Sequence, residues 1–284
     1  MTRLVSRFVV LFVFASLLVA EAGAWEVKIA YVLVSRTVNH SVVVQTVDGK
    51  TVAEIPNAIT PTWTPEGEIL FVTDRADGPG VLHLASSDGM NIRSLGYEGA
   101  FPTVFHDLLA FVARVGMRSK VFVVRRDGGV PVSLGIGGDF IAIGETRIVF
   151  SGAIFPENDD ILDGLVSVEF GPVLAGQEPK QEFVVEGERP TFLKDGRLVY
   201  VNDHPRIPEI RVRNLKTGDD RLLVSNSRTF YVTKGGEREY IVYLPVGGNG
   251  KPHAISPDGG DSFELPFDYF GDVYGDLDDG TRAV

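Results

Sequence analysis

The sequence contains no cysteine among its 284 residues. That absence excludes a disulfide scaffold, zinc sites built on cysteine, catalysis by a thiol, and lipid attachment through an N-terminal cysteine. A chain of this length does not need cross-links, because it can bury a large apolar core without them.

Basic residues are outnumbered. The chain carries 27 Lys and Arg against 38 Asp and Glu, which gives a formal net charge of −11 at pH 7. An acidic protein repels nucleic-acid phosphates, and no basic stripe along the sequence offsets that repulsion. We therefore expect no nucleic-acid partner.

No apolar run is long enough to cross a membrane as a helix. The longest covers residues 8–20, whereas a spanning helix needs about 20 residues. Arg3 and Arg7 precede it, and Ala22-Gly23-Ala24 follows as a small-residue cleavage motif. This order predicts a secretory signal peptide over residues 1–24 and one exported domain over 25–284. We expect a periplasmic or extracellular protein with no stable membrane insertion after cleavage; an uncleaved anchor is the alternative.

Catalytic motifs are missing as well. Neither Gly-x-Ser-x-Gly nor His-Glu-x-x-His occurs, and no two of the five histidines are close in sequence. Those histidines are His40, His83, His106, His204 and His253. The sequence therefore identifies no catalytic residue, and we expect a non-catalytic protein.

An acidic segment before Gly164 is a candidate calcium site. Calcium takes six to eight oxygen ligands, and Asp159, Asp160 and Asp163 supply clustered carboxylates. However, Ile161 and Leu162 interrupt the alternating Asp spacing of known calcium loops. A solvated acidic loop without metal is the other interpretation, so calcium is the one cofactor with a candidate site.

What the sequence does contain is a repeat. A short apolar motif with an aromatic residue at or near its third position recurs six times. The spacings between successive aromatic residues are 40, 40, 39, 50 and 43 residues. A period of about 40 residues with β-type residues in each unit is typical of β-propeller blades. The aromatic residues are Tyr31, Phe71, Phe111, Phe150, Tyr200 and Tyr243.

The second unit shows how one blade would be built. The pattern predicts a first strand over 61–64, a second over 69–73, a third over 81–85 and a short outer strand over 91–95. Asp88-Gly89 closes the hairpin before the outer strand. Four antiparallel strands in about 40 residues make one blade, so the sequence predicts an all-β, six-bladed β-propeller with four-stranded antiparallel blades.

The later units follow the same order. Their second strands are continuous apolar runs, as expected for strands covered on both faces. The third unit should end in an outer strand over 131–134, and the fourth should begin a new first strand near Phe140. A turn at Gly171 should then lead to the outer strand over 182–185.

The two ends of the chain complete one unit between them. The first unit starts at its second strand, 27–35, whereas the segment 269–274 resembles a first strand with nothing to follow it. We expect this C-terminal segment to supply the inner strand of the first blade and so close the ring, because closure removes open sheet edges. A frayed acidic tail is the alternative.

Residues 61–75 carry a family resemblance. They read Pro-Thr-Trp-Thr-Pro-Glu-Gly-Glu-Ile-Leu-Phe-Val-Thr-Asp-Arg, which resembles the TolB-like propeller repeat of exported bacterial proteins: Pro-x-Trp-Ser-Pro-Asp-Gly, an apolar strand, then Ser-Asp-Arg. Residues 87–95 fit the second half of that repeat, and 189–198 repeat the first half more loosely. The resemblance implies a six-bladed, protein-binding module of the bacterial periplasm or cell surface. The α/β domain ahead of the propeller in TolB itself has no counterpart, which argues against membership of the Tol-Pal system.

Loops between second and third strands share a face with the connections between blades, and such loops on a rigid scaffold are where recognition concentrates. We expect them to bind a protein or other macromolecular partner, with the protein itself a monomer. The candidate binding residues are Arg114, Arg118, Lys120, Asp159, Asp160, His204 and Arg206.

Two other functions stay open. One is a propeller enzyme of the metal-dependent lactonase or lyase type, with its site in the central channel. The other is a structural or sensory module of a larger envelope complex. Polar residues expected to face the channel are Thr62, Thr103, Asp139, Thr191, Thr229 and Asp272.

Overall fold

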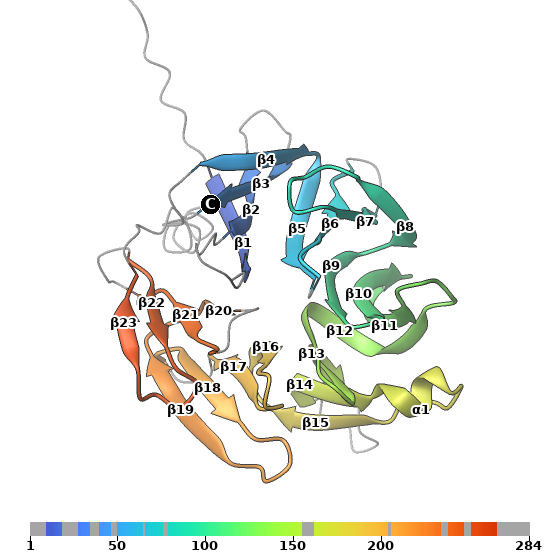
Figure 1. Cartoon of the computed structure of the whole chain (residues 1–284). Helices are drawn as coiled ribbons and strands as arrows, with labels where there is room; N and C mark the ends of the chain where they lie inside the picture. The colour runs from blue at the N-terminus through green and yellow to red at the C-terminus, as the bar shows by residue number, and fades with distance from the viewer. Residues whose placement is uncertain are drawn as a thin grey trace, which may run out of the picture.

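The computed structural model describes residues 10–18, 28–34, 40–46, 50–64, 66–75, 79–154, 162–203, 206–233, 238–246 and 251–265. Among them, strands dominate and one short helix occurs, α1 (Phe170–Leu174). All neighbouring strands pair antiparallel, and the sheets are arranged around a common centre (Figure 1). The predicted all-β class is therefore confirmed. No helix within these ranges is long and apolar enough to cross a membrane.

Four of the five sheets contain four strands that pair in chain order, as the repeat predicts. The first holds β1 (Val10–Leu18), β2 (Lys28–Val34), β3 (His40–Thr46) and β4 (Thr51–Pro56). The second holds β5 (Ala58–Trp63), β6 (Ile69–Thr73), β7 (Val81–Ala85) and β8 (Arg93–Glu98). Towards the C-terminus lie β16 (Glu188–Phe192), β17 (Leu198–Asn202), β18 (Glu209–Arg213) and β19 (Asp220–Ser225), then β20 (Phe230–Val232), β21 (Ile241–Tyr243), β22 (His253–Ile255) and β23 (Ser262–Glu264).

The remaining sheet has seven strands because two repeats share one of them. Its members are β9 (Ala100–Phe105), β10 (Leu108–Val115), β11 (Arg118–Arg125), β12 (Val132–Ile143), β13 (Arg147–Ile154), β14 (Leu162–Glu169) and β15 (Gln181–Val185). The first part of β12 pairs with β11 as the outer strand of the third repeat. Its second part pairs with β13 as the inner strand of the fourth repeat.

The prediction of two separate strands, over 131–134 and from Phe140, is therefore wrong. The intervening glycines bend β12 instead of ending it. Register shifts occur between Val121 and Phe122 in the pairing with β11, and between Gly137 and Ile141 in the pairing with β13. A β-bulge bends the strand that carries it. β12 can therefore pair with β11 along its first part and with β13 along its second.

The core lies between consecutive sheets. In β6 the run from Ile69 to Val72 is at most 1% exposed, which fits a strand covered on both faces. One cluster joins Val42 and Ile55 of the first sheet to Trp63 of the second. Each such Val, Leu, Ile or Phe side chain contributes about 1.5–3 kcal/mol when fully buried. The packing of one sheet on the next therefore holds neighbouring sheets together.

The innermost position of the first sheet is held by an N-terminal strand. β1 pairs with β2, with Val10 opposite Val34 and Leu18 opposite Lys28. The sequence interpretation gave this position to the segment 269–274, which lies outside the described residues. An apolar run can take it because the edge of β2 offers unpaired backbone groups to any extended segment.

Candidate functional site

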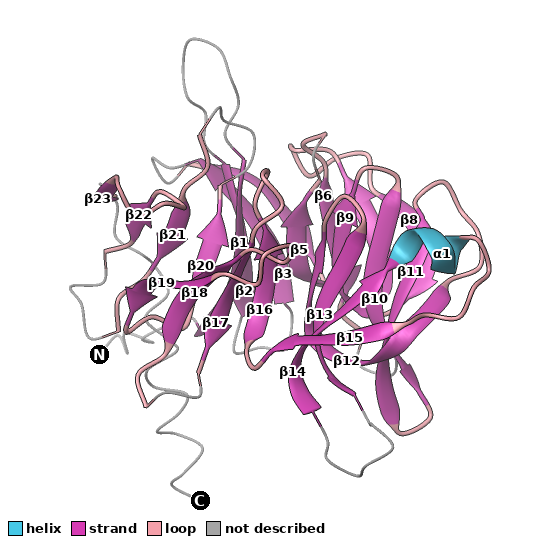
Figure 2. Ribbon diagram, turned by 90° about the horizontal axis from the view of Figure 1, so that it is seen from below, coloured by secondary structure: helices cyan, strands magenta, loops and turns pink. Residues whose placement is uncertain are grey.

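The topology separates two faces of the molecule. Strands run between these faces (Figure 2), and each repeat begins at the face where the previous one ended. Hairpins between second and third strands therefore lie on one face with the connections between repeats. Hydrogen bonds confirm this: Asp74 N donates to Asn57 O at 2.7 Å, and Val246 N donates to Asn226 O at 2.8 Å. We call this the hairpin face.

Apolar side chains are exposed at the tips on the hairpin face. Met117, in the β10–β11 turn, is 91% exposed, and Val115 beside it is 49% exposed. Three further exposed apolar residues lie at the corresponding positions of the fourth, fifth and sixth repeats: Leu162 at the start of β14, and Ile207 and Val246 in the connections between second and third strands. This row of apolar tips covers four consecutive repeats and suits a partner. The opposite face also exposes apolar residues, Met90 and Val130, in the β7–β8 and β11–β12 hairpins.

The opposite face uses its charges to join repeats to each other. Arg126, in the β11–β12 hairpin, pairs with Glu66 at 2.8 Å and also with Glu68, both in the turn of the preceding repeat. Arg197 pairs in the same way with Asp258 of the following repeat, at 2.8 Å. These side chains are engaged within the protein, which leaves the hairpin face as the better candidate for binding.

The β10–β11 hairpin divides the predicted basic cluster. Val115 lies directly opposite Arg118, and Arg114 opposite Ser119. Because successive side chains point to opposite sides of a strand, Arg118 and Lys120 lie on one side and Arg114 on the other. Arg114 Nε donates to the carbonyl of Gly116 at 3.2 Å. The sequence placed all three cations in one site, whereas the structure brings together only two of them.

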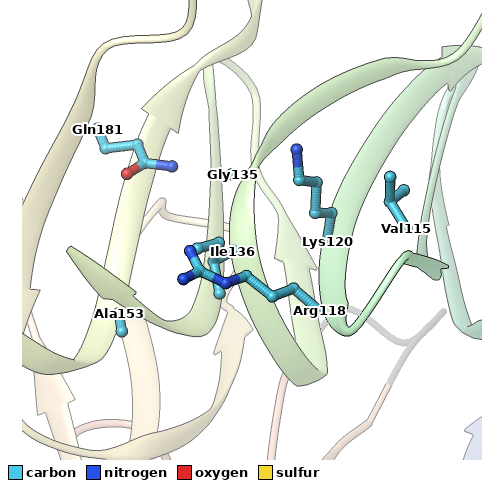
Figure 3. Close-up of a pocket in the computed structure, with 7 residues that line it drawn as sticks. All are labelled: Val115, Arg118, Lys120, Gly135, Ile136, Ala153 and Gln181. Carbon is cyan, nitrogen blue, oxygen red and sulfur yellow. The ribbon is translucent and has the colours of Figure 1, made fainter. Parts of the chain in front are cut away.

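Arg118 and Lys120 line a pocket between the third and fourth repeats (Figure 3), which we call the basic pocket. Its volume is about 460 Å³. Its other lining residues are Val115 from the hairpin, Gly135 and Ile136 from β12, Ala153 from β13 and Gln181 from β15. The pocket thus combines two cations with an amide and three small or branched apolar side chains.

Gly135 allows the far wall of the basic pocket to form. Gln181 Nε2 donates to the carbonyl of Leu134 at 2.7 Å. A Cβ on Gly135 would lie 1.5 Å from that same nitrogen, and Gly135 has a φ of +141°. Any side chain at Gly135 would therefore displace the amide that spans from β15 to β12.

The structure describes only two of the other predicted site residues, Arg206 and Asp163. Arg206 is exposed on the hairpin face, between β17 and β18. Asp163 is exposed on β14, opposite Ala153. Asp159, Asp160 and His204 lie outside the described residues, so the calcium site stays a prediction. Within the part of the chain that the structure describes, no three His, Asp or Glu side chains are grouped closely enough to hold a metal ion.

Similar structures place the fold among known propellers. TolB from Acinetobacter baumannii superposes with a TM-score of 0.57 at 13% identity, over 89% of this chain and 79% of that one. The fold is that of a TolB-like β-propeller. The β-propeller domain of the Trilobed protease from Pyrococcus furiosus matches with a TM-score of 0.52 at 10% identity, over 94% of this chain and 98% of that domain.

TolB-like propellers share this architecture with enzymes. The gluconolactonase XC5397 from Xanthomonas campestris matches with a TM-score of 0.53 at 12% identity, over 81% of this chain and 82% of that one. No protein-family model and no curated protein matches the sequence. The similarity therefore establishes a propeller fold and does not choose between binding and catalysis, so function has to be argued from the site.

Proposed function

We propose that this protein is an exported, non-catalytic propeller that binds a protein partner through its hairpin face. The observation that carries the proposal is the set of apolar tips on consecutive repeats: Val115, Met117, Leu162, Ile207 and Val246. Methionine is unbranched and polarizable, and it is enriched where proteins meet. Exposing it almost completely at a hairpin tip has no structural benefit that we identify.

The charges beside these tips favour a specific partner over simple adhesion. Arg114 and Arg118 flank Met117, and Arg206 precedes Ile207. Interfaces commonly surround an apolar centre with polar residues, with arginine enriched among them. The proposed partner therefore presents an apolar patch with acidic residues around it.

Photo-crosslinking from single positions tests which face binds. A photoreactive amino acid at Met117 or Ile207 should form covalent adducts with one protein in the native envelope. The matched controls are Met90, 64% exposed, and Val130, 86% exposed, which lie in the β7–β8 and β11–β12 hairpins of the opposite face. Adducts from the controls alone, or from no position, would refute binding through the hairpin face.

We further propose that the mature domain begins after residue 24 and forms six blades, with the segment 269–274 closing the ring. Loss of residues 1–24 would also remove β1, and the edge of β2 would then need another strand. The sequence of 269–274 continues the repeat at that point. The seven-stranded sheet counts as two blades because both repeats use β12.

Truncation tests this closure. Deleting 269–284 from the chain 25–284 should lower Tm by about 5 °C, because one strand and its packing are lost. The control deletes only 280–284 and should leave Tm unchanged within error. Equal melting of the two truncated chains would mean that the C-terminal segment does not close the ring.

A further inference from the structure

The basic pocket is a local exception in an acidic protein. The chain as a whole carries a net charge of −11, yet two cations line one pocket. Arg118 and Lys120 are two residues apart on β11, so their side chains leave the strand on the same side, about 7 Å apart along it. Both side chains therefore reach the same pocket.

We propose that the basic pocket holds the carboxylate of a glutamate side chain, carried by an extended segment of the partner. This inference rests on the proposed function, because the pocket adjoins the apolar tip of the β10–β11 hairpin through Val115. The guanidinium of Arg118 can bind a carboxylate in two parallel hydrogen bonds, and the Lys120 ammonium adds a point charge.

The walls of the pocket fit the rest of such a segment. Ile136 and Ala153 offer apolar surface to the methylene groups of a glutamate. One N–H of the Gln181 amide is used by the carbonyl of Leu134. The amide also carries a second N–H and a carbonyl oxygen, groups of the kind that pair with the acceptor and donor of a peptide group. Cations on one side and an amide on the other therefore suit an acidic residue within a peptide.

A pair of short capped peptides tests the pocket without the partner. The probes are acetyl-Gly-Glu-Gly-amide and its twin acetyl-Gly-Gln-Gly-amide, titrated into the isotope-labelled chain 25–284. We expect the glutamate peptide to shift the amide signals of Gly135, Ile136, Ala153 and Gln181, with a Kd on the order of 1 mM. The glutamine peptide should leave these signals in place, and 0.5 M salt should weaken the glutamate response.

Variants of one hairpin supply the matched control. The double variant Arg118→Gln with Lys120→Gln should bind the glutamate peptide at least about 10-fold more weakly, because it loses both cations. Arg114→Gln changes the charge of the same hairpin on its other side and should bind as the wild type does. Equal weakening by both variants would overturn the proposal, as would the absence of any shift in the pocket. Tighter binding of inorganic phosphate than of the glutamate peptide would also overturn it, in favour of a free-anion site.

Crosslinking from Met117 separates this inference from the proposed function. If the double variant still forms the adduct but no longer binds the peptide, the hairpin face binds a partner without using the pocket, and the inference fails. If the adduct and the peptide response are lost together in the double variant, while Lys216→Gln keeps both, the inference is supported, because Lys216 is an exposed cation of the β18–β19 turn on the opposite face. If the wild type binds the peptide but no position on the hairpin face forms an adduct, the proposed function fails and the carboxylate pocket stands.

Discussion

Replacing Asp220 by alanine should lower the free energy of unfolding by about 3 kcal/mol. The Asp220 carboxylate on β19 accepts hydrogen bonds from the Tyr200 hydroxyl at 2.6 Å, from Arg211 Nε at 2.8 Å and from Arg213 Nη1 at 2.9 Å. Its side chain is 17% exposed. The substitution would leave two guanidinium groups and a phenol around a site that no longer holds an anion, which costs more than the loss of a surface ion pair.

The neighbouring Asp219 is the control for this measurement. Asp219 is exposed and accepts a hydrogen bond from the Thr217 hydroxyl at 2.6 Å. Asp219→Ala should cost less than about 1 kcal/mol, as exposed positions usually do. Urea denaturation of the wild type and both variants gives the comparison. If Asp220→Ala were no more destabilising than Asp219→Ala, the network around Tyr200 would have no special part in stability.

The contribution of Asp220 should disappear in acid. Burial by itself raises the pKa of Asp220, but the hydrogen bonds from Tyr200, Arg211 and Arg213 outweigh burial and hold the pKa below its ordinary value. A carboxyl group with a lowered folded-state pKa stabilises the fold above its unfolded pKa of about 3.9. That stabilisation is lost as the pH falls through the folded-state pKa. The difference between wild type and Asp220→Ala should therefore be constant near neutral pH and shrink below about pH 4.

Gly187→Ala should also cost about 3 kcal/mol, through overlap and backbone strain together. Gly187 joins β15 to β16 with a φ of +150°, which L side chains rarely adopt. A Cβ there would lie 2.7 Å from Cδ2 of Tyr200 and 2.7 Å from the carbonyl oxygen of Val201. Tyr200 is 1% exposed and held through its hydroxyl by Asp220, so its ring has no room to move. The connection between the fourth and fifth repeats has to shift instead.

Gly218→Ala is the control: a glycine with a positive φ but without a close contact. Gly218 has a φ of +80°, and no heavy atom lies within 4 Å of the position of its Cβ. Its replacement should cost only about 1 kcal/mol, the penalty for a left-handed alanine. Thermal unfolding of both variants measures the difference. Equal losses would show that the close approach of Gly187 to Tyr200 carries no energetic weight.

Strands with strong local patterns could be predicted from the sequence. The second and third strands of the second repeat, Ile69–Thr73 and Val81–Ala85, agree with β6 and β7 at both ends. Turn residues bound these strands, and their apolar side chains must be buried. The outer strand begins at Arg93 instead of residue 91 and runs to Glu98. Outer strands are less buried, so their limits depend on tertiary pairing more than on pattern.

Features that depend on the three-dimensional path of the chain were not predicted from the sequence. The sequence predicts separate strands over 131–134 and from Phe140, whereas the glycines between them, at 135, 137 and 138, let one bulged strand continue as β12. The turn expected at Gly171 became α1 followed by a longer connection to β15. The partners Arg126 and Glu66 are 60 residues apart, so no local pattern could pair them.

The candidate site could be predicted only in part. The sequence predicts Arg118 and Lys120 as site residues, because a cluster of basic residues in a loop can be recognised from the sequence alone. It did not select Val115, Met117 or Gln181, which become relevant only when the hairpin folds and the fourth repeat packs against it. The alternation of side chains on β10 and β11 was the one available signal that could have separated Arg114 from the other two cations.

The sharing of β12 couples the third and fourth repeats mechanically. In a propeller whose blades contact each other only through side chains, one blade can unfold locally without the next. Here one strand, β12, belongs to two repeats. If β12 separates from β11, its pairing with β13 is weakened as well, because both pairings use the same strand. We therefore expect the amide exchange rates of the third and fourth repeats to change together. A ligand bound at Gly135 and Ile136 would stabilise both repeats, because it would contact the strand that they share. Amide exchange should then slow at residues that the ligand does not contact.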